Sequence, residues 1–278
     1  MDRDQDERYL LGHGEEEWDR LNEQHLTWRH TLLDPLPRYR PLPADGSGLR
    51  VLEAGCGNGA LLADLADYAG PEGTAVGVEL DPAAAGRARR ANAERPWVEI
   101  REGDLLELDS LLGNVTFDLV VSRWVLSFLS RPEAAVEQLA HRLAPGGVLV
   151  VQDYDYDGLR VYPGDPLFEK LFNIMPEAYR QRGGDAWIAC RLPALFEGSG
   201  LELLAVDPHC QAGPPSSPVF RWVERFFLQH DHTLVEGGLL TAEERQGLRA
   251  AWRGARETPG TVLFSPLVVN VVGRRPES

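Results

Sequence analysis

The chain has 278 residues, of which 43% are hydrophobic and 26% charged, so it can bury a sizeable core. Its formal net charge of -15 argues against sequence-independent binding of nucleic acid, which needs clustered Lys and Arg. No apolar run reaches the roughly 20 residues that span a bilayer, and the first residues carry no signal pattern. The three cysteines show neither metal nor disulfide spacing. We therefore expect a cytoplasmic protein that holds no metal and binds neither nucleic acid nor membranes.

The first 45 residues predict a helix followed by a stiff linker. Leu21, Gln24, Trp28 and Leu32 recur at helical spacing, so one face of this helix can pack inward. Four prolines between residues 35 and 43 end the helix. We expect these first 45 residues to form a unit of their own.

Residues 46–153 predict a core in which strands alternate with helices. We expect strands at 49–54, 75–79, 97–101, 117–122 and 147–153, with helices at 59–69, 82–94, 104–112 and 132–143. Such alternation is typical of parallel strands joined by helical crossovers.

Residues 154–278 predict the rest of the sheet, interrupted by helical insertions. Strands are expected at 201–207 and 262–273, and helices at 166–182, 191–199, 217–236 and 241–256. Aromatic residues gather in these insertions, where they would build a chamber for a mostly apolar small molecule. Core packing explains about half of them equally well.

The most informative segment joins the first strand of the core to its first helix. Residues 51–59 read Val-Leu-Glu-Ala-Gly-Cys-Gly-Asn-Gly, and a turn without Cβ at three positions lets a ligand touch the main chain. The next strand ends in Glu79, a carboxylate where a ribose would lie. A dinucleotide fingerprint places its third glycine three positions after the second, whereas Gly59 follows Gly57 by two. The pattern therefore indicates a nucleoside-cofactor site, and its glycine spacing speaks against NAD.

Two further motifs complete the set. Gly103-Asp104-Leu105 follows the third strand, and Pro145-Gly146-Gly147 precedes the fifth. With the segment from Glu53 to Gly59 and with Glu79, they resemble the motifs of the class I S-adenosylmethionine-dependent methyltransferases. This resemblance, with the predicted elements, implies an α/β fold with a Rossmann-like, seven-stranded, mostly parallel sheet and helices on both faces.

The resemblance also implies where S-adenosylmethionine binds and S-adenosylhomocysteine leaves. Gly55 and Gly57 would bring their backbone to the methionyl part, and Glu53 would balance its ammonium. Glu79 would accept both ribose hydroxyls, a contact that suits a carboxylate.

The third strand would hold the adenine. Asp104 would accept from the adenine amino group, while Leu80 and Leu105 would enclose the ring. Asp104 is equally suited to cap the helix that follows it, and one side chain can serve both roles.

The stretch after the fourth strand would pass the reacting sulfur. There the resemblance places Ser122 beside the cofactor, and Arg123 and Trp124 beside the substrate. Packing of Arg123 and Trp124 against the helix at 132–143 is the alternative interpretation.

The first helix resembles that of the ubiquinone- and menaquinone-biosynthesis-type branch, whose members act on small molecules. There it folds over the cofactor as a lid, so Tyr9, Gln24 and Trp28 would contact the methionyl end and exclude water. Simple hydrophobic docking of Trp28 is the competing interpretation.

Residues 153–157 read Asp-Tyr-Asp-Tyr-Asp at the end of the fifth strand. Ligands bind at this edge of open α/β sheets, so Asp153 and Asp155 are candidates for a general base or for holding a cationic amine. Strand alternation would put Tyr156 on the other side, facing the substrate. A solvated acidic loop is the plainer alternative.

These patterns predict transfer of a methyl group to a small, mostly apolar acceptor, in secondary metabolism. The acceptor atom stays open, and so does a homodimer. Two alternatives remain: a protein that binds S-adenosylmethionine without transferring methyl, such as a cyclase or regulatory module, and an NAD-dependent oxidoreductase.

Overall fold

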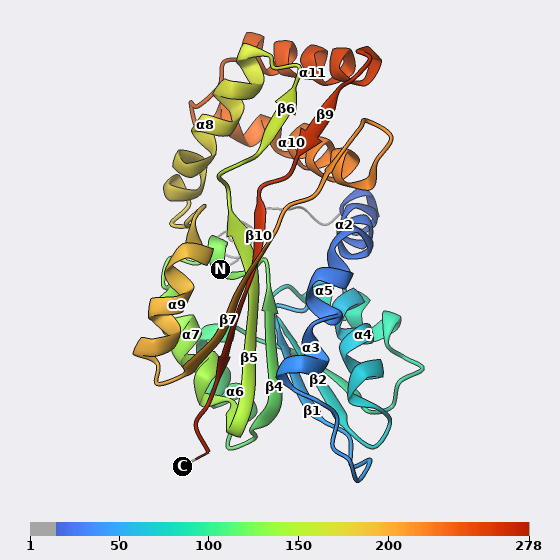
Figure 1. The fold of residues 1–278 in the computed structure, drawn as a ribbon, viewed down its shortest axis with the longest axis vertical. Helices are drawn as coiled ribbons and strands as arrows, with labels where there is room; N and C mark the ends of the chain where they lie inside the picture. The colour runs from blue at the N-terminus through green and yellow to red at the C-terminus, as the bar shows by residue number, and fades with distance from the viewer. Residues whose placement is uncertain (1–14, 278) are drawn as a thin grey trace.

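The computed structural model describes residues 15–277, and its seven-stranded sheet forms the lower part of the molecule in Figure 1. The strand order is β3-β2-β1-β4-β5-β10-β7. Strands β1 to β5 run parallel, and β10 is antiparallel to both β5 and β7. This confirms the mostly parallel, Rossmann-like sheet. Tyr9 lies outside the described residues.

The parallel strands alternate with helices nearly where the sequence predicts them, because each buried apolar run is followed by turn residues and a helical repeat. The bounds of this half are β1 (Arg50–Ala54), α4 (Ala60–Ala69), β2 (Thr74–Glu79), α5 (Pro82–Ala91), β3 (Val98–Glu102), η1 (Leu105–Glu107), α6 (Leu108–Leu112), β4 (Phe117–Arg123), η2 (Leu126–Phe128), α7 (Pro132–His141) and β5 (Leu143–Asp155).

Helices cover both faces of the sheet. Helices α4 and α5 pack on the face near β1, β2 and β3, while α7 and α9 (Ile188–Gly198) pack on the other face against β5. Each face has its own apolar core, since strands that are covered on both sides are hydrophobic in every position. The sheet is therefore rigid, and it holds the carboxyl ends of its strands in fixed positions.

The second half of the chain adds a cap above those carboxyl ends (Figure 1). It contributes two strands to the main sheet, β7 (Glu202–His209) and β10 (Leu267–Arg274), which leave the cap as long ribbons. The cap itself consists of β6 (Arg160–Tyr162), α8 (Pro166–Gln181), β8 (Ala212–Gly213), α10 (Pro218–Glu236), α11 (Ala242–Glu257) and β9 (Val262–Phe264).

One expectation about the second half was wrong. The strand expected at 262–273 is split into β9 and β10 at Ser265-Pro266, because Pro266 has no N–H to donate and the Ser265 amide bonds to Gln211 outside the ladder. Strand β9 pairs with β6 and β8 in a second, three-stranded sheet. The hydrophobic periodicity of the sequence did not predict this sheet.

The linker after the first helix also differs from the expectation. Helix α2 (Glu15–Leu33) is followed by a short helix, α3 (Leu36–Tyr39), rather than by extended chain. Pro37 lies in its first turn, where the missing N–H costs nothing, and Leu36 anchors it in the core.

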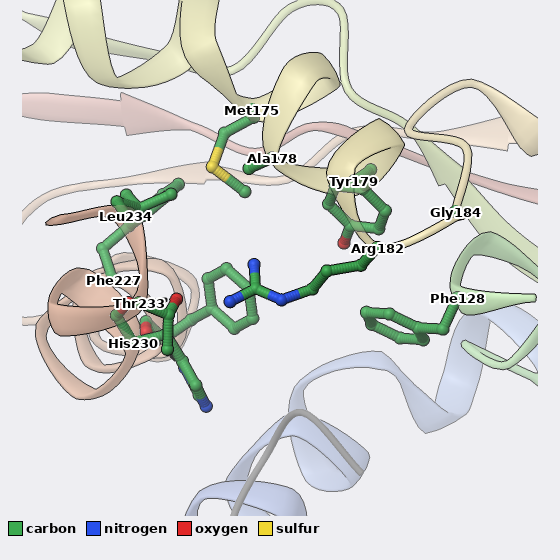
Figure 2. Close-up of a pocket in the computed structure, with 11 residues that line it drawn as sticks. Phe128, Met175, Ala178, Tyr179, Arg182, Gly184, Phe227, His230, Thr233 and Leu234 are labelled. Atoms are coloured by element: carbon green, nitrogen blue, oxygen red, sulfur yellow. Dashed lines mark hydrogen bonds between the residues drawn. The ribbon is translucent and has the colours of Figure 1, made fainter. Parts of the chain in front are cut away.

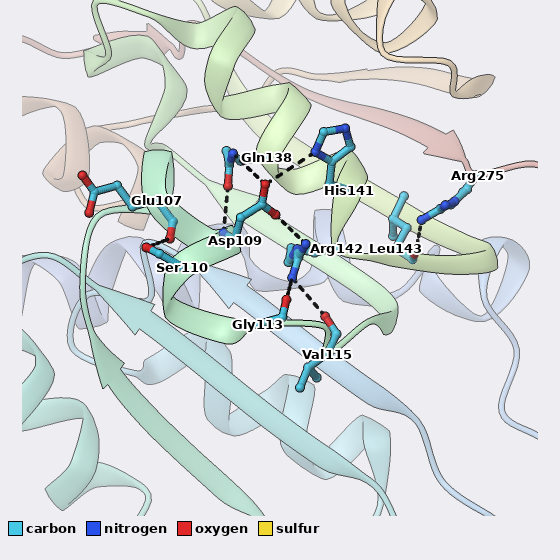
Figure 3. Close-up of polar contacts among 10 residues, drawn as sticks. All are labelled: Glu107, Asp109, Ser110, Gly113, Val115, Gln138, His141, Arg142, Leu143 and Arg275. Atoms are coloured by element: carbon cyan, nitrogen blue, oxygen red, sulfur yellow. Dashed lines mark hydrogen bonds and ion pairs between the residues drawn. The ribbon is translucent and has the colours of Figure 1, made fainter.

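A polar cluster lies at the other end of the parallel strands, away from the cap (Figure 3). Arg142, at the end of α7, donates to the carbonyl of Gly113 and pairs with Asp109 of α6. The Asp109 amide in turn donates to the Gln138 side chain at 3.0 Å. These contacts fix α6, which follows β3, against α7.

We predict that the cap depends on Trp252, which is 1% exposed and packs against Phe168 with ring centroids 4.5 Å apart. Trp252→Ala should lower the free energy of unfolding by about 3–5 kcal/mol, because a large cavity opens in the cap core. Chemical denaturation measures this. Trp187→Ala is the matched control, since Trp187 is 40% exposed; equal losses in both variants would contradict the prediction.

Candidate functional site

A cavity of about 540 Å³ lies between the carboxyl ends of the parallel strands and the cap. Its floor comes from the residues that follow β1, β2 and β3, and its far wall from the segment after β4. Helix α2 and the cap helix α10 contribute the roof. This is the edge where open α/β sheets bind ligands.

The glycine turn forms the floor because only glycine fits there. Gly55 has φ of +78°, and a Cβ on it would lie 2.4 Å from a methyl carbon of Val125. Gly57 has φ of +53°, but a Cβ on it would meet nothing within 4 Å. Gly55 is therefore needed for packing. Gly57 instead keeps the cavity open, because a side chain at this position would extend into the empty space.

Glu79 ties this turn to the end of β2. One carboxylate oxygen accepts from the Gly57 amide at 2.7 Å, and the other accepts from the Asp81 amide at 3.0 Å. Burial raises the pKa of Glu79, while the two amide bonds oppose that rise. The carboxylate is thus held at the cavity wall in one orientation.

Glu53 and Arg123 face the cavity with incomplete hydrogen bonding. Within the part of the chain that the structure describes, Glu53 Oε2 and Arg123 Nη1 are buried and have no hydrogen-bond partner. Burial raises the pKa of Glu53 to about 8 and lowers the pKa of Arg123 to about 10. Buried polar atoms are rarely left unpaired, so both positions are suited to a charged ligand.

Asp104 and Leu105, which follow β3, and Leu80, which follows β2, line the same cavity. Asp104 Oδ1 accepts from the Leu106 amide at 2.9 Å, so the expected capping role is observed. Leu80 is 42% exposed, which is unusual for a large apolar side chain beside a cavity and suits contact with a flat ring.

Aromatic rings form the opposite wall. Trp124 has φ of +54°, a strained conformation for a bulky residue, and its ring stacks on Tyr154 with centroids 5.9 Å apart. The Arg123 guanidinium lies 4.7 Å from the centroid of the same ring. This strain turns the Trp124 side chain toward the cavity.

Helix α2 closes the site from above. Its Asn22 accepts from the Asn58 side chain in the glycine turn at 2.8 Å, and its Glu23 pairs with Arg225 of α10 at 2.7 Å. Gln24 lines the cavity and accepts from Arg20 at 2.7 Å and from Trp222 at 3.0 Å.

The structure does not bring five of the expected residues to the cavity. Trp28 is fully buried and packs edge-on against Trp222 at 5.2 Å, in agreement with the docking interpretation. Ser122 is also fully buried, and its hydroxyl donates to the Ala54 carbonyl at 3.0 Å. This bond joins β4 to β1, because strand alternation turns the Ser122 side chain away from the ligand edge.

The other three residues lie at the end of β5. Asp153 is buried and accepts from the Ser127 amide at 3.1 Å, so it supports η2; burial raises its pKa to about 6. Asp155 accepts from the Cys190 thiol at 3.5 Å, away from the cavity. Tyr156 packs between Tyr154 and Tyr179 in the cap core. The aspartates and tyrosines do separate to two sides, but neither candidate base reaches the site.

The sequence reasoning missed several residues that line the cavity. The motifs do not include Arg20, Phe128, Arg131 and Arg182, which come together only when the cap packs on the sheet. Asn58 and Tyr154 also line the cavity, and both lie inside motifs in which no role was predicted for them.

A smaller apolar pocket of about 50 Å³ adjoins the main cavity, with which it shares Phe128, Arg182 and Phe226. Figure 2 shows the Arg182 guanidinium reaching in among the side chains of Phe128, Tyr179 and Phe227. Apolar residues of the insertions therefore line this small pocket, although many of the aromatic side chains belong to the cap core.

Comparison with known proteins decides the family. Residues 52–149 match the model of a methyltransferase domain. An uncharacterized methyltransferase of Schizosaccharomyces pombe is 30% identical over 231 residues, which cover 77% of this chain and 81% of that protein. The chain belongs to the class I S-adenosylmethionine-dependent methyltransferases.

Other relatives match this methyltransferase only in part. Trans-aconitate 2-methyltransferase of Deinococcus radiodurans is 35% identical over 103 residues, which cover 37% of each protein. The chain spans about a third of the length of the first curated relatives that it matches. The solved N-methyltransferase NodS of Bradyrhizobium japonicum, in complex with S-adenosyl-L-homocysteine, has a TM-score of 0.53 at 19% identity and covers 98% of both chains. This structural similarity shows that the chain shares the fold of NodS.

The site fits the cofactor of this family. A zwitterionic methionyl group carries an ammonium and a carboxylate; Glu53 and Arg123 line the cavity, and each has one buried side-chain atom without a hydrogen-bond partner among the described residues. The glycine turn leaves space where a side chain would otherwise stand. Within residues 15–277, no three His, Cys, Asp or Glu side chains gather as metal ligands, and no helix is long and apolar enough to cross a membrane.

We predict that Gly57→Ala weakens cofactor binding more than tenfold. The added methyl group would point into the cavity, while the fold should lose only about 1–2 kcal/mol because φ is positive. Gly200→Ala is the matched control, since Gly200 has φ of +77° and open space but lies outside the cavity. Calorimetric titration with S-adenosylhomocysteine separates the two, and equal affinities would contradict the prediction.

We also predict that cofactor binding releases a proton. Glu53 is mostly protonated at pH 7 because its pKa is about 8, and an incoming ammonium favours the carboxylate form. Affinity should therefore fall as the pH drops below about 8, with about one proton released at pH 7. Titrations in two buffers of different ionisation enthalpy measure this number. Glu53→Gln should release almost none, and a wild-type heat that is independent of buffer would overturn the prediction.

Proposed function

We propose that this protein transfers the methyl group of S-adenosylmethionine to a small, mostly apolar acceptor of the kind that secondary metabolism produces. The observation that carries the proposal is the main cavity together with the apolar pocket that adjoins it. Glu53, Glu79 and Asp104 form the acidic end of the main cavity, and the smaller pocket in the cap shares Phe128, Arg182 and Phe226 with it.

We place the cofactor along the acidic end. Glu79 would accept the ribose hydroxyls, since its carboxylate is already held at the wall by two amides. Glu53 would bind the methionyl ammonium, and Arg123 the carboxylate beside it. Asp104 Oδ2 would accept from the adenine amino group, because Oδ1 serves the cap of η1.

The cofactor supplies an electrophilic methyl group on a sulfonium. The protein aligns the acceptor with it and excludes water, which together can contribute several kcal/mol. The rings of Trp124 and Tyr154 can stabilise a cationic centre nearby. Helix α2 acts as the lid in this proposal, because Asn22 and Gln24 join the glycine turn to the cap.

The three functions open at the sequence level make different predictions. An oxidoreductase would bind NADH, and a module without transferase activity would bind S-adenosylmethionine without turnover. Calorimetry with both cofactors, followed by an assay for S-adenosylhomocysteine release across small apolar acceptors, separates them. The proposal fails if S-adenosylmethionine does not bind, or if it binds and no acceptor stimulates release.

The Glu79→Gln variant tests the placement of the ribose. It should weaken S-adenosylmethionine binding by about 1–3 kcal/mol, because a charge-assisted contact is lost. Glu102→Gln is the matched control: Glu102 ends the neighbouring strand β3 but pairs with Arg89 at 2.6 Å outside the cavity. Equal binding by the two variants would place the ribose elsewhere.

A further inference from the structure

Charges are segregated along the main cavity. The acidic side chains stand at the ends of β1 and β2 and just after β3. The lining arginines come from other elements, namely Arg20, Arg123, Arg131 and Arg182. The protein carries a net charge of -15, so a wall of arginines is a local feature that its composition does not provide. Arg123 lies beside Glu53, so the acidic end carries both signs, whereas the part of the cavity lined by Arg131 and Arg182 suits an anion.

Two of these arginines already interact with carboxylates of the protein. Arg20 is bonded to Glu17 at 2.6 Å, and Arg123 lies beside Glu53 at the cofactor end. Arg182 is different, because the carboxylates near it in the chain are engaged elsewhere. Glu177 pairs with Arg180 at 2.6 Å, and Asp185 pairs with Arg191 at 2.9 Å.

Arg182 is also the cationic group of the smaller pocket. Its guanidinium extends among Phe128, Tyr179 and Phe227 (Figure 2). His230 is the other ionisable base in that lining, and its Nδ1–H donates to the Phe226 carbonyl at 2.7 Å. Burial lowers the pKa of His230 to about 4, so this ring is neutral near pH 7. The pocket therefore combines apolar walls with a single positive charge.

Arg182 is an exposed residue that lines the pocket, and its planar guanidinium can bind a carboxylate through two parallel hydrogen bonds. Arg182 lines both the smaller pocket and the main cavity, so an anion bound to it leaves the ligand body within reach of the cofactor end. We propose that the methyl acceptor is a small apolar acid whose carboxylate binds Arg182. This inference rests on the proposed function and adds the chemical class of the acceptor.

The test uses pairs of probes that differ only in charge. Apolar carboxylic acids, such as 3-phenylpropanoate, 4-hydroxycinnamate and decanoate, are each compared with the corresponding primary amide. Binding is measured by calorimetry on the full chain saturated with S-adenosylhomocysteine. We expect the acids to bind about ten times more tightly than the amides. Arg182→Gln should remove this preference, mainly by weakening the acids.

Arg180→Gln is the matched control, because Arg180 lies two residues away on α8 and points outside both pockets. It should keep the preference for acids. The inference is overturned if no acid binds, if acids and amides bind equally, or if the preference survives in Arg182→Gln. Binding of S-adenosylmethionine with methylation of neutral acceptors would overturn this inference alone. Failure to bind S-adenosylmethionine would instead overturn the proposed function.

Discussion

The bond between the Gly57 amide and the Glu79 carboxylate is the contact on which the site depends. It joins the turn after β1 to the end of β2 and fixes a buried carboxylate at the cavity wall. The parallel sheet makes this contact possible, because it brings the carboxyl ends of two strands to the same edge. A glycine at position 57 then leaves the adjoining space open.

The site combines a rigid floor with a roof assembled from distant parts of the chain. The floor is covered on both sides by helices and belongs to two apolar cores. The roof comes from α2 and from the cap, which has a core of its own. The side-chain bond between Asn22 and Asn58 joins α2 to the floor, and the bond between Gln24 and Trp222 joins α2 to the cap. Buried Trp28 and Leu32 also pack α2 into the apolar cores, so core packing as well as polar contacts holds this part of the roof.

Charged side chains are distributed unevenly along the cavity. Carboxylates line the ends of β1 and β2 with Arg123 beside them at the end of β4, and Arg131 and Arg182 line another part. A cationic cofactor and an anionic acceptor would therefore bind side by side with opposite preferences. The raised pKa of Glu53 and the lowered pKa of Arg123 show that both groups lose hydration in the free protein, so a zwitterionic ligand would relieve both.

The sequence by itself determined the parallel core, the glycine turn and the acidic residues at the strand ends. These features are local: hydrophobic periodicity sets each element, and a turn that needs positive φ selects glycine. It left two interpretations of Trp28 open and did not reveal that Asp153 supports η2 or that Ser122 bonds to β1, because the tertiary structure decides which side of each element is covered. Tertiary structure alone brought Arg182 beside Phe128 and split the last strand at Pro266. Contacts between residues so far apart in the chain depend on how the cap packs against the sheet, and no local pattern records that packing.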